Sequence, residues 1–202
     1  GLTMLPPDIN APVANVEFGV HEGKIVFGLT AIKGLGRQAA KDIVRAREEK
    51  GAFKDIFDFC ERIDHRQVSK AGIERLIKAG AFDKLGGKRS QFLAILPRAA
   101  QAGQSAQEDK KRGQMNLFDS FAAAAPEASA ATVELPDIPE MPDAEKLAEE
   151  KKVLGFYMSS HPLARQEGMI KALSSHRVAD AASMPEKAEV TLGGMITGLT
   201  IK

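Results

Sequence analysis

The sequence predicts a mainly α-helical fold with two helix-loop-helix units in tandem, a small β-hairpin, a flexible linker and an incomplete β region at the C-terminus. Three observations support this prediction. From Arg37 onward apolar residues recur at helical spacing, whereas two short runs before it are rich in β-branched and aromatic residues. Residues 103–143 are polar or rich in Ala, Pro and Ser. Apolar residues among Thr and Gly return near the C-terminus.

The first expected elements are an extended connector and a hairpin. Residues 1–14 contain three prolines, which favour a connector without regular structure. The β-rich runs 16–20 and 25–29 flank a four-residue loop that contains Gly23, an arrangement typical of a β-hairpin. Because an isolated hairpin is only marginally stable in water, we expect it to pack against another element.

Four helices are expected next. Their expected positions are residues 37–50, 56–63, 70–79 and 89–102. Asp55 and Ser69 precede two of them as N-cap residues, and Gly51 can end the first. The helices form two units about 40 residues apart, and together with the hairpin they define an expected domain over residues 15–103.

The second half of the chain is predicted to be less compact. Residues 104–143 are interpreted as a mobile linker, because prolines and a run of small residues prevent regular structure. A helical connector is expected over residues 144–185, beginning with a helix at 144–157. Residues 186–202 are expected to form the first strand or strands of a β unit that the chain does not complete.

Composition narrows the classes of function. The chain has 202 residues, 44% hydrophobic and 27% charged, and can therefore bury a core. No apolar run reaches the roughly 18 residues of a transmembrane span, so we expect no membrane partner. The single cysteine cannot form an internal disulfide, which suits a reducing, cytoplasmic compartment. One cysteine and four scattered histidines also predict no metal site.

The net charge of +1 conceals a strong asymmetry. Residues 31–113 carry 19 Lys and Arg against 11 Asp and Glu, a net of +8. Residues 119–150 carry 1 Lys against 9 Asp and Glu, a net of −8. This asymmetry indicates a module that faces a polyanion, followed by a segment that avoids the polyanion. Ordinary solvated helix faces are the alternative interpretation.

The stretch from Lys33 to Lys41 is the most informative part of the sequence. Gly34 and Gly36 flank the apolar Leu35 just before a helix, so the first N–H groups of that helix face outward beside the positive end of its dipole. Glycines allow a phosphate to approach closely. The candidate DNA-backbone-binding residues here are Lys33, Gly34, Leu35, Gly36, Arg37 and Lys41.

This pattern is the helix-hairpin-helix signature, which binds nucleic-acid backbones without reading the bases. The alternative is a glycine-rich connection with incidental charge. A looser copy follows over residues 76–89, and its candidate DNA-backbone-binding residues are Gly86, Gly87, Lys88 and Arg89. Asp83 lies in the same copy and disfavours a nearby phosphate, so a purely structural role for it stays equally open.

A short apolar island interrupts the linker. It consists of Gln114, Met115, Asn116, Leu117 and Phe118. Leu117 and Phe118 can enter an apolar pocket of a partner protein, while the amide of Gln114 forms hydrogen bonds at its edge. The alternative is that this pair folds back onto the core of the chain itself.

No catalytic constellation emerges from the sequence. Asp55 and Asp58 share a helical turn, but helix capping explains them better than metal binding does. Cys60 lies among apolar residues and is interpreted as a small buried hydrophobe. The chain is therefore expected to bind rather than to catalyse.

Together these motifs resemble the bacterial replicative DNA polymerase III alpha subunit. The stretches that carry the resemblance are residues 25–36, 51–53, 58–59 and 76–83. Residues 5–10 resemble the end of the fingers domain in that family, so residues 1–14 would close that domain. Residues 148–162 resemble the stretch that leads to its oligonucleotide-binding (OB) fold.

The resemblance implies a role for each region. Residues 15–103 would hold duplex DNA behind the polymerase active site, and residues 186–202 would begin the OB fold. Residues 114–118 would dock into the beta sliding clamp and tether the polymerase for processivity. This motif differs from the commonest Gln-Leu-x-Leu-Phe form of the family only at Met115.

The resemblance also implies what this chain lacks. The catalytic palm residues and their Mg²⁺ belong to other parts of such a DNA-directed DNA polymerase, as do the sites for other replicase subunits. The chain itself is expected to be inactive and to hold no cofactor. A non-enzymatic helix-hairpin-helix clamp adaptor or DNA-repair scaffold is the alternative function.

Overall fold

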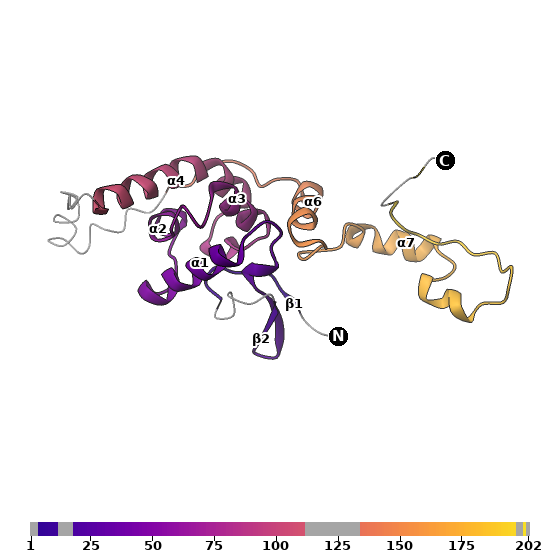
Figure 1. Ribbon diagram of the computed structural model, residues 1–202. Coiled ribbons are helices and arrows are strands. Elements are labelled where there is room, and N and C mark those ends of the chain that lie inside the picture. The colour runs from indigo at the N-terminus through magenta and orange to yellow at the C-terminus, as the bar shows by residue number, and fades with distance from the viewer. Residues whose placement is uncertain (1–3, 12–17, 112–133, 197–199, 201–202) are drawn as a thin grey trace. The chain divides into compact units, whose positions relative to one another are not determined.

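The computed structural model describes residues 4–11, 18–111, 134–196 and 200 (Figure 1). The chain divides into two compact units, Gly1–Met158 and Ser159–Lys202. The first unit gathers helices around one hydrophobic core beside a small sheet. The predicted mainly α-helical fold with a small β-hairpin is confirmed.

The hairpin consists of β2 (Phe18–His21) and β3 (Lys24–Phe27), which pair antiparallel. The connection is tighter than the predicted four-residue loop, because His21 already pairs with Lys24. The two turn residues Glu22 and Gly23 both have positive φ, 50° and 73°. Two successive residues with positive φ match the twist of antiparallel strands, and this explains the short turn.

The N-terminal stretch is part of the fold rather than a connector. β1 (Met4–Leu5) pairs parallel to β3, giving the sheet order β1-β3-β2. Ile9 is fully buried and its N–H donates to the carbonyl of Ala81, 3.1 Å away. The side chain of Asn10 binds both the N–H and the carbonyl of Phe53. These contacts join the stretch to both helix-loop-helix units.

The four expected helices are all present in the first unit. They are α1 (Arg37–Lys50), α2 (Ile56–Arg62), α3 (Lys70–Lys78) and α4 (Arg89–Lys111). Both predicted caps are confirmed. The carboxylate of Asp55 accepts hydrogen bonds from the N–H groups of Phe57 and Asp58, and the hydroxyl of Ser69 accepts one from that of Gly72.

An aromatic cluster fills the centre of the core. The ring of Phe59 meets those of Phe53 and Phe82 edge to face, with 4.9 Å between centroids in each pair. Phe92 on α4 continues the cluster, 5.8 Å from Phe82. Edge-to-face contacts add to the hydrophobic gain of burying these rings, so the cluster links α2 and α4 with the turn that follows α3.

Helix α4 continues beyond residue 104, where the linker was expected to begin. Its last two turns lie against α2: the side-chain amide of Gln107 donates to the carbonyl of Glu61, and Lys110 forms an ion pair with the Glu61 carboxylate. Gly103 permits this approach, because a Cβ there would lie 2.3 Å from the carbonyl oxygen of Cys60. Packing against α2 therefore keeps these polar residues helical.

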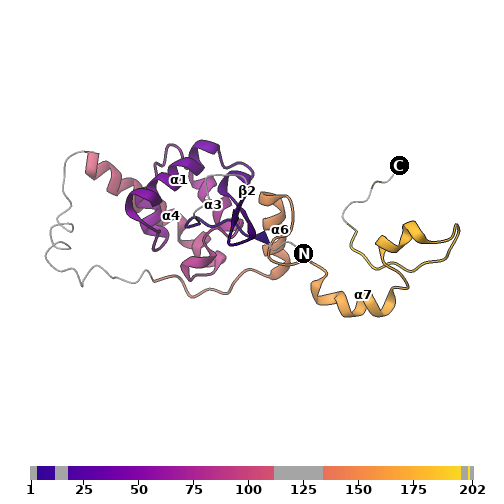
Figure 2. The same ribbon diagram turned by 90° about the horizontal axis from the view of Figure 1, so that it is seen from below.

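The chain is described again from residue 134 and reaches α6 (Asp143–Leu154) through an extended stretch (Figure 2). Leu147, Val153 and Leu154 are buried, so the predicted helix packs on the first unit. It ends three residues earlier than expected, because Gly155 adopts the left-handed conformation with φ 94°.

In the second unit, α7 (Glu167–Leu173) follows a 3₁₀ turn at Ala164–Gln166, and a further 3₁₀ stretch spans Val178–Ser183. Residues 184–196 form no strand among themselves in the described part of the chain. Thr191 is held by Ser175, whose N–H donates to the carbonyl of Thr191. A strand needs a neighbouring strand to satisfy its backbone groups, and among the described residues of this unit none pairs with residues 184–196.

Candidate nucleic-acid interface

The first glycine turn presents an open helix N-terminus. Gly34 has a φ of 76°, and Leu35 beside it is buried in the core. Gly36 is the N-cap of α1, and among the described residues no side chain forms a capping hydrogen bond there. The N–H groups of the first turn, including that of Arg37, thus lie at the positive end of the helix dipole, and no side chain within the described ranges accepts from them.

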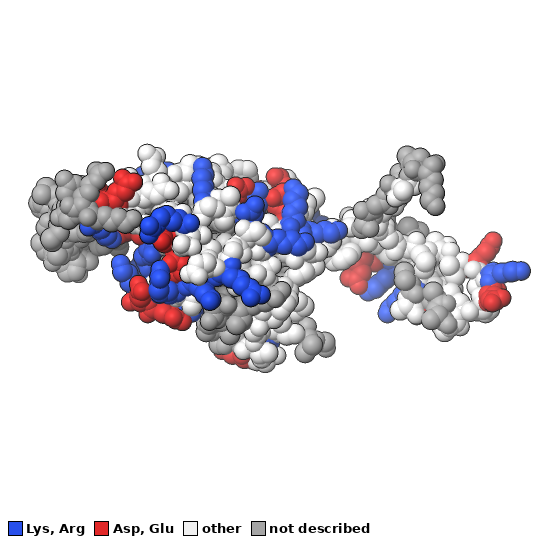
Figure 3. All heavy atoms as spheres, in the orientation of Figure 1, with Lys and Arg blue, Asp and Glu red and all other residues white. Residues whose placement is uncertain are grey.

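Exposed cations surround this turn as predicted. Lys33, Arg37 and Lys41 are exposed, and none of them forms an ion pair with a carboxylate of the described residues. Over the first unit, Figure 3 shows Lys and Arg side chains with Asp and Glu between them, so the surface is not uniformly basic. Cations without a carboxylate partner are the ones that are free to neutralise a phosphate.

Sequence reasoning missed a fourth cation at this turn. The guanidinium of Arg75 on α3 lies against Gly34, where a Cβ would be 2.9 Å from its central carbon, and it donates to the Gly34 carbonyl at 3.3 Å. Arg75 lies 41 residues further along the chain, so no local pattern indicates this contact. Only the packing of α3 against the turn creates it.

A cavity of about 440 Å³ lies beside this turn, and its polar lining includes Lys33, Arg75, Lys78, Glu149 and Lys152. Lys78 forms ion pairs with Glu74 and Glu149, and the hydrogen bond that its ammonium group donates to Glu74 is the main reason why its pKa is raised. Lys152 and Lys78 hold the pKa of Glu149 below its usual value. Carboxylates thus neutralise two cations of the cavity, Lys78 and Lys152, while no carboxylate in the described part of the chain forms an ion pair with Lys33 or Arg75.

The second glycine turn is arranged differently. Gly80 and Gly86 both have positive φ, 85° and 83°, and Lys88 is exposed as expected. Arg89, however, is only 3% exposed. Its guanidinium donates to both carboxylate oxygens of Asp83, at 2.9 and 2.7 Å. It also donates to one carboxylate oxygen of Glu150, at 2.8 Å. This corrects the expectation for Arg89, which joins α4 to α6 and does not face outward.

The N-terminus of α4 is also occupied. The carboxylate of Glu140 accepts hydrogen bonds from the N–H groups of Arg89 and Ser90, each at 3.1 Å. Burial opposes ionisation of Glu140, but the N–H groups of Ser90, Met141 and Arg89 outweigh burial, and its pKa is lowered. Gly87 is covered as well, because Leu135 lies where a Cβ of residue 87 would be. The second turn therefore presents no open amides at this point.

The apolar island Gln114–Phe118 lies outside the described residues. What the structure describes are the segments on either side of it. Helix α4 ends at Lys111, and the chain is described again from residue 134.

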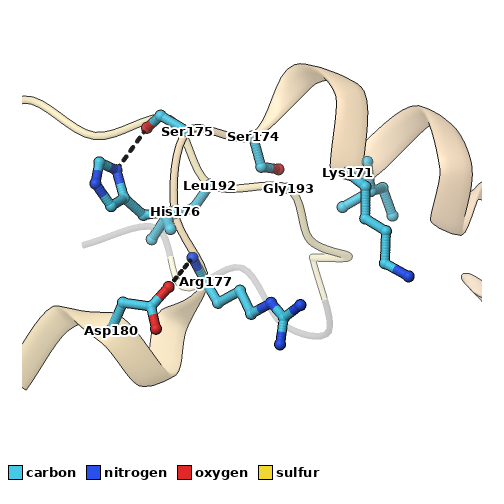
Figure 4. A pocket seen from close by; sticks show the side chains of 9 residues that line it. Lys171, Ser174, Ser175, His176, Arg177, Asp180, Leu192 and Gly193 are labelled. Atoms are coloured by element: carbon cyan, nitrogen blue, oxygen red, sulfur yellow. Dashed lines mark hydrogen bonds between the residues drawn. The ribbon is translucent and has the colours of Figure 1, made fainter.

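A separate cavity of about 500 Å³ lies in the second unit (Figure 4). There Ser175 Oγ and His176 Nδ1 are 2.9 Å apart, and Asp180 accepts a hydrogen bond from the N–H of Arg177. Figure 4 shows the Asp180 carboxylate directed at that backbone group and not at the imidazole. A serine–histidine–aspartate relay needs the carboxylate to orient the histidine, so these residues do not form one.

The remaining candidates have structural roles. The capping bonds of Asp55 explain that residue, and Asp58 forms an ion pair with Arg62 at 2.9 Å. Cys60 is buried, and burial raises its pKa to about 12. Within the described ranges, no cluster of three or more His, Cys, Asp or Glu could hold a metal ion. No helix in that part of the chain is long and apolar enough to cross a bilayer.

Comparisons with known proteins agree with this architecture. A family model described as a helix-hairpin-helix motif matches residues 1–92. The chain is 36% identical to the DNA polymerase III subunit alpha of Caulobacter vibrioides over 92% of its own length, and 36% identical to that of Vibrio cholerae over 97%. The corresponding subunit of Deinococcus radiodurans is 36% identical over the whole chain. The chain spans only 15–17% of the length of these relatives.

Proposed function

Because this chain belongs, as a segment, to the bacterial DNA polymerase III alpha subunit family, we propose that it holds duplex DNA by its backbone and tethers a replicative polymerase to the beta sliding clamp. The segment contributes binding, whereas nucleotide transfer and its Mg²⁺ belong to other regions of the parent protein. Other replicase subunits also bind elsewhere on that protein. The observation that carries the proposal is the open first glycine turn, whose exposed cations form no ion pair with any carboxylate that the structure describes.

The open turn supports backbone binding without sequence selectivity. N–H groups at a helix N-terminus and a nearby guanidinium or ammonium group both bind phosphate oxygens, which are the same at every base pair. Lys33, Arg37 and Lys41 come from the turn and from α1, while Arg75 reaches the same point from α3. Four cations around one uncapped helix end can contact one or two neighbouring phosphates.

Clamp binding rests on the sequence of Gln114–Phe118. Leu117 and Phe118 provide two large apolar anchors, and such anchors carry most of the affinity of a short peptide for its pocket. A clamp encircles the duplex, so DNA bound at the first turn makes the clamp contact intramolecular. Effective concentrations for short flexible links are about millimolar, so two weak contacts combine into a much tighter one.

The DNA proposal is tested by the salt dependence of affinity for a duplex of arbitrary sequence. Each lost phosphate contact lowers the slope of log affinity against log salt by about 0.9. Lys33→Ala with Arg37→Ala is therefore expected to lower the slope by up to roughly 1.8 for two contacts. The matched control is Arg66→Ala with Lys110→Ala, which removes two cations that already pair with Asp64 and Glu61. Equal slopes for the two double variants would contradict the proposal.

The clamp proposal is tested by comparing three ligands at one salt concentration: clamp loaded on DNA, clamp alone and DNA alone. We expect loaded clamp to bind much more tightly than either part. If it binds no more tightly than the better part, the tethering argument is wrong. A segment that binds DNA but not the clamp would instead favour a DNA-binding role without the tether.

A further inference from the structure

The stretch from Glu134 to Asp143 has a three-residue repeat. Its sequence is Glu-Leu-Pro-Asp-Ile-Pro-Glu-Met-Pro-Asp, in which an acidic residue, an apolar residue and a proline recur in order. In an extended chain a period of three places residues of one kind on one side. The burial agrees with this, because Leu135, Ile138 and Met141 are all half-buried. Three of the acidic residues are exposed, namely Glu134, Asp137 and Asp143. We call residues 134–143 the acidic strap.

The acidic strap lies along the start of α4 through a series of contacts. The side-chain amide of Gln91 donates to the carbonyl of Pro136 at 2.8 Å, and the ammonium group of Lys88 donates to that of Ile138 at 3.0 Å. The hydroxyl of Ser90 donates to the carbonyl of Pro139 at 2.8 Å. Every one of these donors lies in the second glycine turn or the first turn of α4.

Glu140 completes the docking. One of its carboxylate oxygens accepts the N–H of Arg89, and the other accepts those of Ser90 and Met141. The first and second of these donors belong to α4. These two are the first N–H groups of a 23-residue helix, where the positive end of the helix dipole lies. A phosphate bound at this helix end would accept the same two hydrogen atoms. Carboxylate and phosphate therefore cannot occupy the position together.

The two glycine turns share several features. Each has a glycine with positive φ, a further glycine before the helix and a cation beside it. Among the described residues, the N-terminus of α1 has no side-chain acceptor, whereas that of α4 holds a carboxylate from 50 residues further along the chain. One turn is open, and the other is filled by an anion of the chain itself.

We propose that the acidic strap is an intramolecular competitor of DNA, in which Glu140 occupies the phosphate position of the second glycine turn and keeps that turn closed. The second turn then adds no phosphate contact while the strap is docked, and release of the strap makes its amides and Lys88 available. This inference rests on the proposed backbone binding, but it concerns the second turn only.

The test compares Glu140→Gln with Asp137→Asn in the full chain. Both remove one negative charge from the strap, but Asp137 is exposed, and among the described residues no hydrogen bond or ion pair joins it to α4, whereas Glu140 accepts two N–H groups of that helix. The glutamine amide has one acceptor atom and cannot bind both N–H groups. Glu140→Gln is therefore expected to tighten binding to a duplex of arbitrary sequence and to steepen the salt slope by about 0.9. Asp137→Asn is expected to leave the slope unchanged.

Lys88 provides a second, independent readout. Lys88→Ala removes a cation and also the hydrogen bond to the Ile138 carbonyl that helps to dock the strap, so its effect is measured in the Glu140→Gln chain. There it is expected to remove most of the gain in DNA affinity. Ser90→Ala removes one hydrogen bond that docks the strap and leaves the charge of the strap unchanged. Like Glu140→Gln, it is expected to tighten DNA binding. Circular dichroism and thermal unfolding show whether each variant stays folded.

Two results would overturn the inference. One is a Glu140→Gln chain that is folded and has the DNA affinity and salt slope of Asp137→Asn. The other is that Lys88→Ala lowers DNA affinity by the same factor in the wild-type chain and in the Glu140→Gln chain. Failure of the proposed DNA binding looks different, because then the wild-type chain binds no duplex, or Lys33→Ala with Arg37→Ala leaves the salt slope unchanged.

Discussion

The ion pair between Arg89 and Glu150 makes the sharpest prediction about stability. The side chains of Arg89 and Glu150 are 3% and 1% exposed, and the guanidinium also binds Asp83 through two nitrogens. Arg89→Met removes the guanidinium that binds the buried carboxylate of Glu150. Removing one partner of a buried ion pair costs about 3–5 kcal/mol, because an uncompensated charge stays behind.

The expected loss is large enough to measure by thermal or denaturant-induced unfolding. A change of 1 kcal/mol shifts the midpoint by about 2–4 °C in a domain of this size, so Arg89→Met is expected to lower it by roughly 6–20 °C. Arg66→Met is the matched control. Its ion pair with Asp64 is exposed, and exposed pairs contribute at most about 1 kcal/mol.

A double variant distinguishes the buried charge from lost packing. Arg89→Met with Glu150→Leu replaces the pair by apolar side chains, a change that is often neutral. We therefore expect it to recover most of the stability lost in Arg89→Met alone. The reasoning is refuted if Arg89→Met lowers the unfolding free energy no more than Arg66→Met does. It is also refuted if the double variant loses as much stability as Arg89→Met and Glu150→Leu lose separately when their losses are added.

Four further predictions follow from other sites. Leu117→Ala with Phe118→Ala is expected to lose clamp binding by roughly thirtyfold per residue in a titration, with the fold unchanged by circular dichroism. Gly34→Ala forces a left-handed residue against the guanidinium that lies there, so unfolding should show a loss of about 1 kcal/mol or more, together with weaker DNA binding. The pKa of Glu140 is lowered in the folded chain, so its ionised carboxylate stabilises the fold above the usual carboxyl pKa. This stabilisation is lost as the pH falls through the pKa of Glu140 in the folded chain, so the difference in unfolding free energy from Glu140→Gln should vanish in acid. Cys60, with its pKa raised to about 12, should resist thiol reagents near pH 8 until the chain unfolds.

Local patterns in the sequence were sufficient for the helices and for the first glycine turn. The N-caps Asp55 and Ser69 act on N–H groups two or three residues away, so their role is readable from spacing. The same holds for Gly34 and Leu35, whose conformation and burial follow from the turn that leads into α1. Whether these residues bind DNA stays a prediction.

Contacts between segments far apart in the chain were decided only by the tertiary structure. Arg89 was assigned to the surface because a cation beside a glycine turn usually faces solvent, yet it is buried against Glu150, 61 residues away. Charge alone suggested only that the acidic stretch avoids the polyanion, and the structure adds that its described part docks on the basic module through Glu140. A sequence shows which groups can form a hydrogen bond or an ion pair nearby. The choice among distant partners depends on which of them the packed core brings within reach, because these interactions act over a few ångströms.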